Sequence, residues 1–592
     1  MKLSTTALLA ITTIASTMGV AGHASAQTIF PIDRARFLVG SRLDVKIEFQ
    51  SVVTADNVKL SINGADAASV LGKQGQLIER EDGAERSSLL FRDVSLAKPG
   101  TYQVEAGDGV HSAQVVWEVY DTPEPRRAKN VILFVGDGLS NAHRVAARML
   151  SKGITEGKYR GRLALDTMPA TALVSTSGVD SIITDSANSM HAYTTGHKSS
   201  NNALGVYVSR ARSHTDHPKV ETITSLVQRR LGMAVGIVTN TEIEDATPAA
   251  MVAHTRRRSD YNTIVHQMFE ARPDVILGGG SANFLPKSTP GSRRNDEEDY
   301  IGKFRAAGYE YAATATELAA VSVKPGTTKL LGLFSSGNMD GVLDRRFLKG
   351  GSVNKFPDQP DLTDQVRAAL SVLAKHDRGF FLMVESGLID KYTHALDMER
   401  AVFDTIMLDN AVQIARDFAS SRNDTLIMVL ADHTHPIGIV GVMHDDMQGA
   451  PPSAPLRERL GIYARAGYPN YPAPDAQGYP DRVDVSRRLA IFSASIPDYY
   501  ETFRPKLDGP NAPSLAGQGE GAASRANPKY ADAPGALLVR GNLPSNANSD
   551  VHSAEDSLLS AAGPGSERIQ GLLDNTEVFE VMARALALGR TP

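Results

Sequence analysis

Several apolar runs of the sequence end in side chains of the kind that bind metal ions. Ligands of open α/β sheets bind beyond the carboxyl ends of the strands, so these groups are expected to converge on one crevice. Asp390 and His394 are four residues apart, which places both on one face if that segment is helical. The runs and the residues that follow them are Val131–Val135 with Gly136-Asp137-Gly138, Phe380–Val384 with Glu385, Asp390 and His394, and Thr425–Leu430 with Ala431-Asp432-His433.

A single residue of this set would be weak evidence for a metal site. A carboxylate at a strand end is commonly the cap of the next helix, and a solitary His is commonly a surface or core residue. Four acids and two His at such positions are not explained by capping alone, so the joint pattern indicates metal binding. The sequence has no cysteine, so any zinc must be held by His and carboxylate ligands.

Ser186 lies in Ile183-Thr184-Asp185-Ser186-Ala187, directly before a stretch of helical character. A Ser at this place is commonly just the N-terminal cap of the helix. The position also suits a nucleophile, because the N–H groups and dipole at that end stabilise an anion such as a phosphorylated Ser. A free hydroxyl needs a base or a metal to react, and no Ser-His-Asp arrangement is recognisable. His191 is interpreted as a helix-surface residue, with a polar contact near bound phosphate as the alternative.

The composition describes an ordinary globular protein without a nucleic-acid partner. The chain has 592 residues, of which 22% are charged, and a net charge of −5. A weakly acidic protein without long charge runs lacks the basic surface that nucleic acids or anionic membranes attract. Any anion must therefore be bound by a local site.

The N-terminus has the pattern of a cleaved secretory signal peptide, residues 1–26. Lys2 precedes an Ala-rich apolar stretch, and Ala24-Ser25-Ala26 fits the small-residue cleavage pattern. The alternative is a membrane anchor, but Thr and Ser interrupt the run, which is shorter than the ~20 residues that a span needs. The mature chain is therefore predicted to be periplasmic or secreted, with no membrane span.

The N-terminal part of the chain, after the predicted signal peptide, is rich in β-strand patterns. Residues 28–121 alternate apolar and polar side chains in short runs, and Asn63-Gly64 is a strong hairpin-turn signal. This spacing predicts a small all-β immunoglobulin-like sandwich, interpreted as a packing or spacer module rather than a binding module. Residues 122–129, with two prolines, are predicted to be a linker.

The remaining residues, 130–592, are predicted to form one α/β catalytic domain. Strand-like runs alternate with helical stretches, which is typical of a largely parallel sheet flanked by helices. A loop-rich insertion at about 437–548 interrupts this rhythm with Pro- and Gly-rich segments and only short strands. Loops of this length inside a compact domain are usually functional covers or disordered.

Several segments, in order, resemble the alkaline phosphatase family. The resemblance runs from about Asn130 to His435 and from Asp550 to Arg584, and it implies an alkaline phosphatase-like fold that acts on small-molecule phosphate esters. Those segments are Gly136-Asp137-Gly138, Ile183–Ala187 with Thr195-Gly196-His197-Lys198 and Ala203–Val206, Asp245–Ala250, Val384-Glu385 with Asp390-Lys391 and His394, Ala431–His435, and Asp550-Val551-His552-Ser553.

Carried over residue by residue, the resemblance implies two zinc ions and one magnesium ion. The implied ligands are Asp390, His394 and His552 for one zinc, Asp137, Asp432 and His433 with the Ser186 oxygen for the second zinc, and Asp137, Thr247 and Glu385 for magnesium.

The resemblance also implies residues that support these ligands or bind the substrate. Asp245 and Lys391 would lie beside the magnesium, Asp185 beside Ser186, and His435 would orient a carboxylate ligand. Arg258, whose neighbours Arg256 and Arg257 are also basic, would bind two phosphate oxygens in bidentate fashion, which a monoester offers and a triester does not.

The implied reaction is hydrolysis of phosphate monoesters through a covalent phosphoserine at Ser186. The nearest alternative is a phosphodiesterase or a promiscuous phosphoester hydrolase on the same core, but such relatives usually lack a third metal site. A sulfatase is disfavoured because there is no Cys and the ligands are of the zinc type. From another class, a catalytically inactive metal-binding surface protein is disfavoured because the ligand set is complete.

Two departures from the family pattern concern substrate access. Asn188 to His191 are bulkier than the small residues usual after the nucleophile. The insertion at about 437–548 lies where family members carry a cover over the active site. It is expected to shape substrate access, and it is a candidate interface for a homodimer.

Overall fold

The computed structural model describes residues 27–447 and 455–589. The predicted signal peptide, residues 1–26, lies outside the described residues, so cleavage and export stay predictions. Within the described ranges, no helix is both long enough and apolar enough to cross a membrane.

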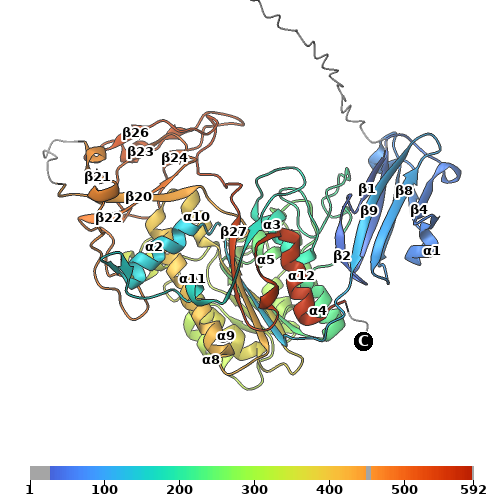
Figure 1. Cartoon of the computed structure of the whole chain (residues 1–592), viewed down its shortest axis with the longest axis horizontal. Coiled ribbons are helices and arrows are strands. Elements are labelled where there is room, and N and C mark those ends of the chain that lie inside the picture. The colour runs from blue at the N-terminus through green and yellow to red at the C-terminus, as the bar shows by residue number, and fades with distance from the viewer. Residues whose placement is uncertain (1–26, 448–454, 590–592) are drawn as a thin grey trace, which may run out of the picture.

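A ten-stranded sheet forms the centre of the larger part of the molecule (Figure 1). All of its strands are parallel except β27, which runs antiparallel to both of its neighbours. The largely parallel sheet predicted from the sequence is therefore present. In spatial order the strands are β16 (Glu310–Ala312), β17 (Leu330–Leu333), β15 (Val275–Gly279), β14 (Ala234–Glu242), β18 (Phe380–Ser386), β10 (Asn130–Gly136), β19 (Thr425–Leu430), β27 (Ser557–Ala562), β13 (Ala170–Ser175) and β28 (Leu572–Asp574).

Helices cover both faces of this sheet, and each face has its own hydrophobic cluster. The central strand β10 is buried throughout and alternates between the two clusters: Val131 and Leu133 belong to one, Ile132 and Phe134 to the other. Uninterrupted apolar strands are expected where both faces of a parallel sheet are covered. The first face packs against α3 (Ser186–Thr195), α4 (Ile223–Leu231), α6 (Tyr261–Ala271), α7 (Tyr300–Ala306) and α12 (Asn575–Leu586), and the second against α2 (Asn141–Lys152), α8 (Ala315–Ser322), α9 (Leu362–Leu373) and α11 (Met398–Ala419).

The N-terminal strands form two further sheets around one apolar cluster. These two sheets together are called the β-unit. The hairpin predicted at Asn63-Gly64 joins β4 to β5, with both residues at positive φ. A short helix, α1 (Ala67–Leu71), follows β5. One sheet holds β1 (Gln27–Phe30), β3 (Leu43–Phe49), β7 (Ser88–Val94) and β6 (Gln76–Ile78); the other holds β2 (Arg36–Leu38), β9 (Ser112–Tyr120), β8 (Gly100–Gly107), β4 (Lys59–Ile62) and β5 (Ala65–Asp66). Its immunoglobulin-like character stays a prediction.

A loop of the larger part, residues 204–220, packs into the β-unit. Tyr207 and Val220 belong to the apolar cluster of the β-unit. Lys46 on β3 is 1% exposed and forms ion pairs with Glu48 at 3.0 Å and Glu81 at 2.6 Å. Arg210 reaches from the loop to Glu81 at 2.9 Å. Polar side chains that alternate along a strand commonly face water, but all residues of β3 are buried because this loop covers them.

The insertion at about 437–548 contains more regular structure than the sequence predicts. Strands β20 (Ile437–His444) and β22 (Arg487–Ser493) are eight and seven residues long and pair with each other, and β20 also pairs with the short β21 (Leu460–Gly461). The insertion lies over one end of α2 and α10 (Leu388–His394) in Figure 1. The remaining strands are short, as expected: β23 (Tyr499–Glu501) pairs with β26 (Leu537–Val539), and β24 (Ser514–Leu515) with β25 (Arg525–Ala526).

Candidate active site

The carboxyl ends of three adjacent strands bring the predicted acids together. Strand β10 lies between β18 and β19, and Val135 is paired with Glu385 on one side and with Leu430 on the other. Asp137 and Asp432 follow β10 and β19 closely, and both are buried. Gly138 has φ +67°, donates its N–H to Asp432, and lies so close to His435 that a Cβ would meet its ring at 2.7 Å. Only glycine fits this turn without strain.

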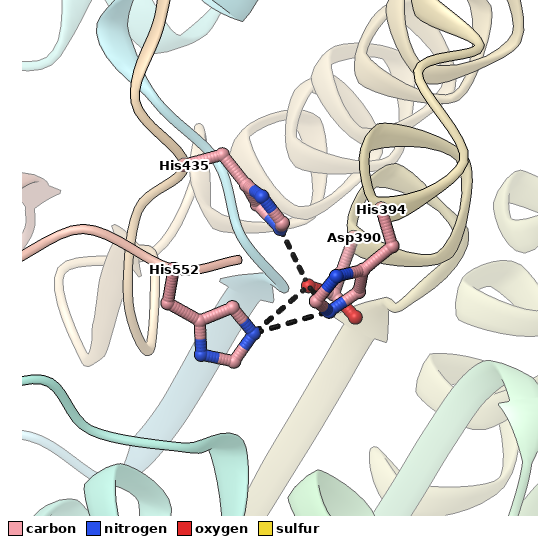
Figure 2. A group of neighbouring side chains, drawn as sticks. All are labelled: Asp390, His394, His435 and His552. Atoms are coloured by element: carbon pink, nitrogen blue, oxygen red, sulfur yellow. Dashed lines mark hydrogen bonds and ion pairs between the residues drawn. The ribbon is translucent and has the colours of Figure 1, made fainter. Parts of the chain in front are cut away.

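A first group of possible metal ligands consists of Asp390, His394, His435 and His552 (Figure 2). Asp390 and His394 lie on the helix α10, as their spacing predicts. The Nε2 atoms of His394 and His552 are 3.1 Å apart, and they lie 3.2 Å and 3.6 Å from Asp390 Oδ1.

The hydrogen bonds of these rings fix where their protons are. His394 Nδ1 lies 2.7 Å from the carbonyl oxygen of Asp550, and His552 Nδ1 lies 2.8 Å from that of Thr184. A carbonyl oxygen only accepts, so each Nδ1 carries a proton, which leaves Nε2 as the atom that each ring can offer to a cation. Two ring nitrogens and a carboxylate oxygen thus converge on one another, as the ligands of one metal ion do.

His435 differs from the other two rings because both of its nitrogens face carboxylates. Its Nε2 lies 2.8 Å from Asp390 Oδ1 and its Nδ1 lies 3.1 Å from Asp550 Oδ2. Burial would lower the pKa of His435, but these hydrogen bonds raise it to about 9. Both ring nitrogens thus already have carboxylate partners, which suits a residue that orients Asp390.

Asp550 is a functional candidate that the sequence analysis missed. It is fully buried, and its Oδ1 accepts from Ser493 at 2.9 Å and from Ser495. Both serines belong to the insertion, so the insertion is joined to Asp390 through Asp550 and His435. Its position two residues before His552 is the one signal in the sequence that points to it.

A second group of possible ligands consists of Asp137, Asp432 and His433. The Nε2 of His433 lies 3.3 Å from Asp137, 3.4 Å from Asp432 and 3.1 Å from the Oγ of Ser186. Asp432 Oδ2 is buried without a hydrogen-bond partner among the described residues. The rings of His433 and His552 stack with centroids 3.4 Å apart, so the two groups are neighbours.

Burial opposes the ionised form of the acids in both groups, but the net effect on the pKa differs between them. Burial raises the pKa of Asp137 well above its ordinary value, and Asp390 and Asp432 raise it further. Burial also raises the pKa of Asp390, but His394, His435 and His552 together hold it well below its ordinary value. Carboxylates packed at this density need positive charge nearby, and divalent cations supply it.

Glu385 and Thr247 lie beside the second group. Glu385 accepts hydrogen bonds from Thr239 and from Thr241, the latter at 3.1 Å, and burial raises its pKa to about 7. Thr247 lies in the short helix α5 (Ala246–Ala249), and within the described ranges its buried hydroxyl has no partner. A buried hydroxyl without a hydrogen-bond partner lowers the stability of the folded protein by about 1–3 kcal/mol, unless a ligand binds it. Thr239 and Thr241 were not found from the sequence, although they alternate at the end of β14.

Ser186 is the first residue of α3, and the helix cap is Asp185 rather than Ser186. The Asp185 side chain accepts from the N–H of Asn188 at 3.0 Å. Ser186 is 2% exposed, and its Oγ lies 3.5 Å from Asp137. The hydroxyl is thus free to face the metal ligands.

The interpretation of His191 as a surface residue is wrong. Its side chain is fully buried, and neither ring nitrogen has a hydrogen-bond partner within the described residues. Burial lowers its pKa well below the ordinary value, so the ring is neutral. Because α3 is buried on all sides, none of its positions is a surface position.

Arg258 is held between two carboxylates. It donates to Asp185 at 3.2 Å and to Asp245 at 3.0 Å, and Lys391 also contacts Asp245 at 3.1 Å. Burial would lower the pKa of Arg258, but Asp245 and Asp185 raise it above its ordinary value. The guanidinium is therefore a permanent cation in a fixed position, and its partner Asp185 directly precedes Ser186 in the chain.

The known proteins most relevant to this geometry are phosphatases. A family model described as alkaline phosphatase matches residues 128–588. The chain belongs to the alkaline phosphatase family. It is therefore a metal-dependent hydrolase of phosphate monoesters, as the resemblance implied.

Individual relatives agree with this family. The alkaline phosphatase of Escherichia coli is 34% identical over 357 residues, which cover 54% of this chain and 73% of the relative. A streptomycin-6-phosphate phosphatase of Streptomyces griseus is 34% identical over 386 residues, 58% of this chain and 81% of the relative. The structure of Thermus thermophilus alkaline phosphatase matches with a TM-score of 0.56 and 26% identity, covering 80% of this chain and 94% of the other.

Proposed function

We propose that this phosphatase hydrolyses phosphate monoesters through a covalent phosphoserine at Ser186. The observation that carries the proposal is the placement of Ser186 Oγ at the start of α3, 3.1 Å from His433 Nε2 and close to both groups of possible metal ligands. No other Ser is proposed as nucleophile, because this placement combines a helix N-terminus with two sets of converging ligand atoms.

The residues fit a site for three divalent metal ions. The converging lone pairs of Asp390, His394 and His552 suit one zinc, and Asp137, Asp432 and His433 suit a second. The unpartnered hydroxyl of Thr247, with Glu385 and Asp137, suits a magnesium ion, which prefers oxygen ligands. When bound, such ions lower the pKa of a hydroxyl group and offset the negative charge of the transferring phosphoryl group.

The chain's own residues then have separate roles. Ser186 Oγ, after loss of its proton, forms a bond to phosphorus while the bond from phosphorus to the leaving oxygen breaks. Arg258, kept in place by Asp185 and Asp245, donates two hydrogen bonds to the non-bridging oxygens. The N-terminal N–H groups of α3 stabilise the resulting phosphoserine, which water then hydrolyses. His435 keeps Asp390 in position throughout by its donated hydrogen bond.

The test is substitution of Ser186 with a matched control. Ser186→Ala is expected to lower the kcat of phenyl phosphate hydrolysis by at least about 10³-fold, because the covalent route is lost. Ser288→Ala changes an exposed Ser in a loop and is expected to leave kcat unchanged. Acid quenching with radiolabelled phosphate is expected to trap label on the wild-type chain and not on Ser186→Ala.

Two outcomes would overturn the proposal. Substantial turnover by Ser186→Ala would exclude Ser186 as nucleophile. A higher kcat/KM for a diester than for a monoester in the wild-type protein would contradict the proposed preference for monoesters. A homodimer, for which the insertion is a candidate interface, stays a prediction from the sequence.

A further inference from the structure

A cavity of about 880 Å³ lies beside the residues that hold Arg258. Its wall includes Arg258, Lys391 and Asp245 from the proposed phosphate site, and it continues along Arg256 and Arg257. Small-molecule sites typically have volumes of about 300–1,000 Å³. The cavity is therefore large enough for the part of a substrate that lies beyond the phosphate group.

The carboxylates of this wall already have cationic partners. Asp245 pairs with Arg258 at 3.0 Å and with Lys391 at 3.1 Å. Glu242, the other acid of the wall, pairs with Arg293. These acids cannot neutralise a further cation without giving up a partner.

Arg256 and Arg257, by contrast, have no carboxylate partner in the part of the chain that the structure describes. Arg256 donates to the carbonyl oxygen of Asn201 at 3.0 Å, which leaves its charge uncompensated. Arg257 is exposed and lines the same cavity. The wall therefore carries surplus positive charge next to the phosphate site.

The backbone that carries these two arginines is fixed by hydrogen bonds to other segments. Arg256 N donates to His214 O at 2.8 Å and Arg258 N to Asn202 O at 2.9 Å. Thr255 pairs with Leu204 in a β-bridge. A fixed backbone reduces the entropy lost when the side chains bind a ligand.

We propose that Arg256 and Arg257 form an anion subsite for phosphate monoesters whose leaving group carries a second anionic group, a carboxylate or another phosphate. This inference rests on the proposed phosphatase function and adds its substrate class. Guanidinium groups bind both kinds of anion in bidentate fashion, and neither kind is excluded by the wall.

The experiment compares three substrates on one aromatic frame: phenyl phosphate, 4-carboxyphenyl phosphate and 1,4-phenylene bisphosphate. The double variant Arg256→Gln/Arg257→Gln is measured against wild type by phosphate release. Arg305→Gln is the control, because Arg305 is an exposed arginine of α7 without a carboxylate partner within the described residues, and it does not line the cavity. The variant-to-wild-type ratio of kcat/KM is taken for each substrate, so differences in leaving-group reactivity cancel.

The double variant is expected to lose about five- to thirtyfold in kcat/KM for the two doubly anionic substrates, mainly in KM, and less than about twofold for phenyl phosphate. Comparison of the carboxylate with the bisphosphate shows which anion the subsite prefers. An equal loss for all three substrates would show general electrostatic steering, and no loss would show no subsite; either result overturns the inference. If the wild-type protein fails to hydrolyse phenyl phosphate, the proposed function has failed instead.

Discussion

Asp550 offers a sharp test of how the insertion supports the metal ligands. Asp550→Asn keeps the shape of the side chain and removes its charge. The neutral amide no longer raises the pKa of His435, so the ring is expected to hold its second proton less tightly. A neutral imidazole can accept at Nδ1 from the amide NH2 of Asn and still donate from Nε2 to Asp390. The hydrogen bond that orients Asp390 therefore persists but loses its cationic donor.

The magnitude follows from that single bond. A hydrogen bond between charged groups contributes about 1.5–3 kcal/mol, and about 1.4 kcal/mol corresponds to a factor of ten. The hydrogen bond to Asp390 is weakened rather than removed, so the lower part of this range applies, and zinc affinity is expected to fall about tenfold. Asp550→Ala also removes the acceptor of Ser493 and Ser495 and is expected to approach about 100-fold, the upper value for residues behind metal ligands.

The assay is competition with a chelator at pH 8, with zinc content and activity followed together. At saturating zinc, Asp550→Asn is expected to recover most of the wild-type kcat. Asp532→Asn is the control, because Asp532 is an exposed residue of the same insertion without an ion pair in the described chain. Wild-type zinc affinity in a folded Asp550→Asn protein would refute the reasoning. A kcat that excess zinc does not restore would show that Asp550 acts on catalysis by another route.

Two further predictions concern magnesium and pH. Thr247→Val removes a buried hydroxyl without a described partner, so it is expected to shift the magnesium dependence of activity by about tenfold without lowering the free energy of unfolding of the metal-free protein; an unchanged magnesium titration would contradict it. Burial would raise the pKa of Glu81, but Lys46 and Arg210 hold it below its ordinary value. Its contribution to stability is therefore complete above the ordinary pKa and is lost as pH falls through the lower folded value. Hydrogen exchange of residues 204–220 is expected to accelerate below that pH in wild type, and an exchange pattern without this acceleration would refute the prediction.

The sequence was sufficient to predict side chains whose placement depends only on the local secondary structure. The strand-end acids could be found because a buried parallel strand is continuously apolar and its end is marked by the first polar residue. Asp390 and His394, the proposed ligand pair on α10, could be placed on one helix face because they are four residues apart. Both rules act over fewer than about ten residues, so no knowledge of the tertiary fold was needed.

The remaining features depend on packing between distant segments. Asp550 and Ser493 are 57 residues apart and meet only because the insertion returns to the metal ligands. His191 was assigned to a surface because an isolated helix has one, whereas α3 is buried between α12, α5 and the sheet. The polar residues of β3 are likewise buried, because the segment 204–220 packs against them. In each case a distant segment buries the residue, and the local periodicity of the sequence does not show which segments pack together.

The β-unit is linked to the proposed phosphate site through main-chain hydrogen bonds rather than attached as a loose spacer. Leu43 of the β-unit pairs with Val220, and Val220 N donates to Gly205 O at 2.9 Å. The adjacent Leu204 pairs with Thr255, at the start of the loop that carries Arg258. Each of these hydrogen bonds limits the movement of the segment that forms the next one, so the segments they join restrict one another. Main-chain hydrogen bonds therefore connect the β-unit with the loop that carries Arg256, Arg257 and Arg258.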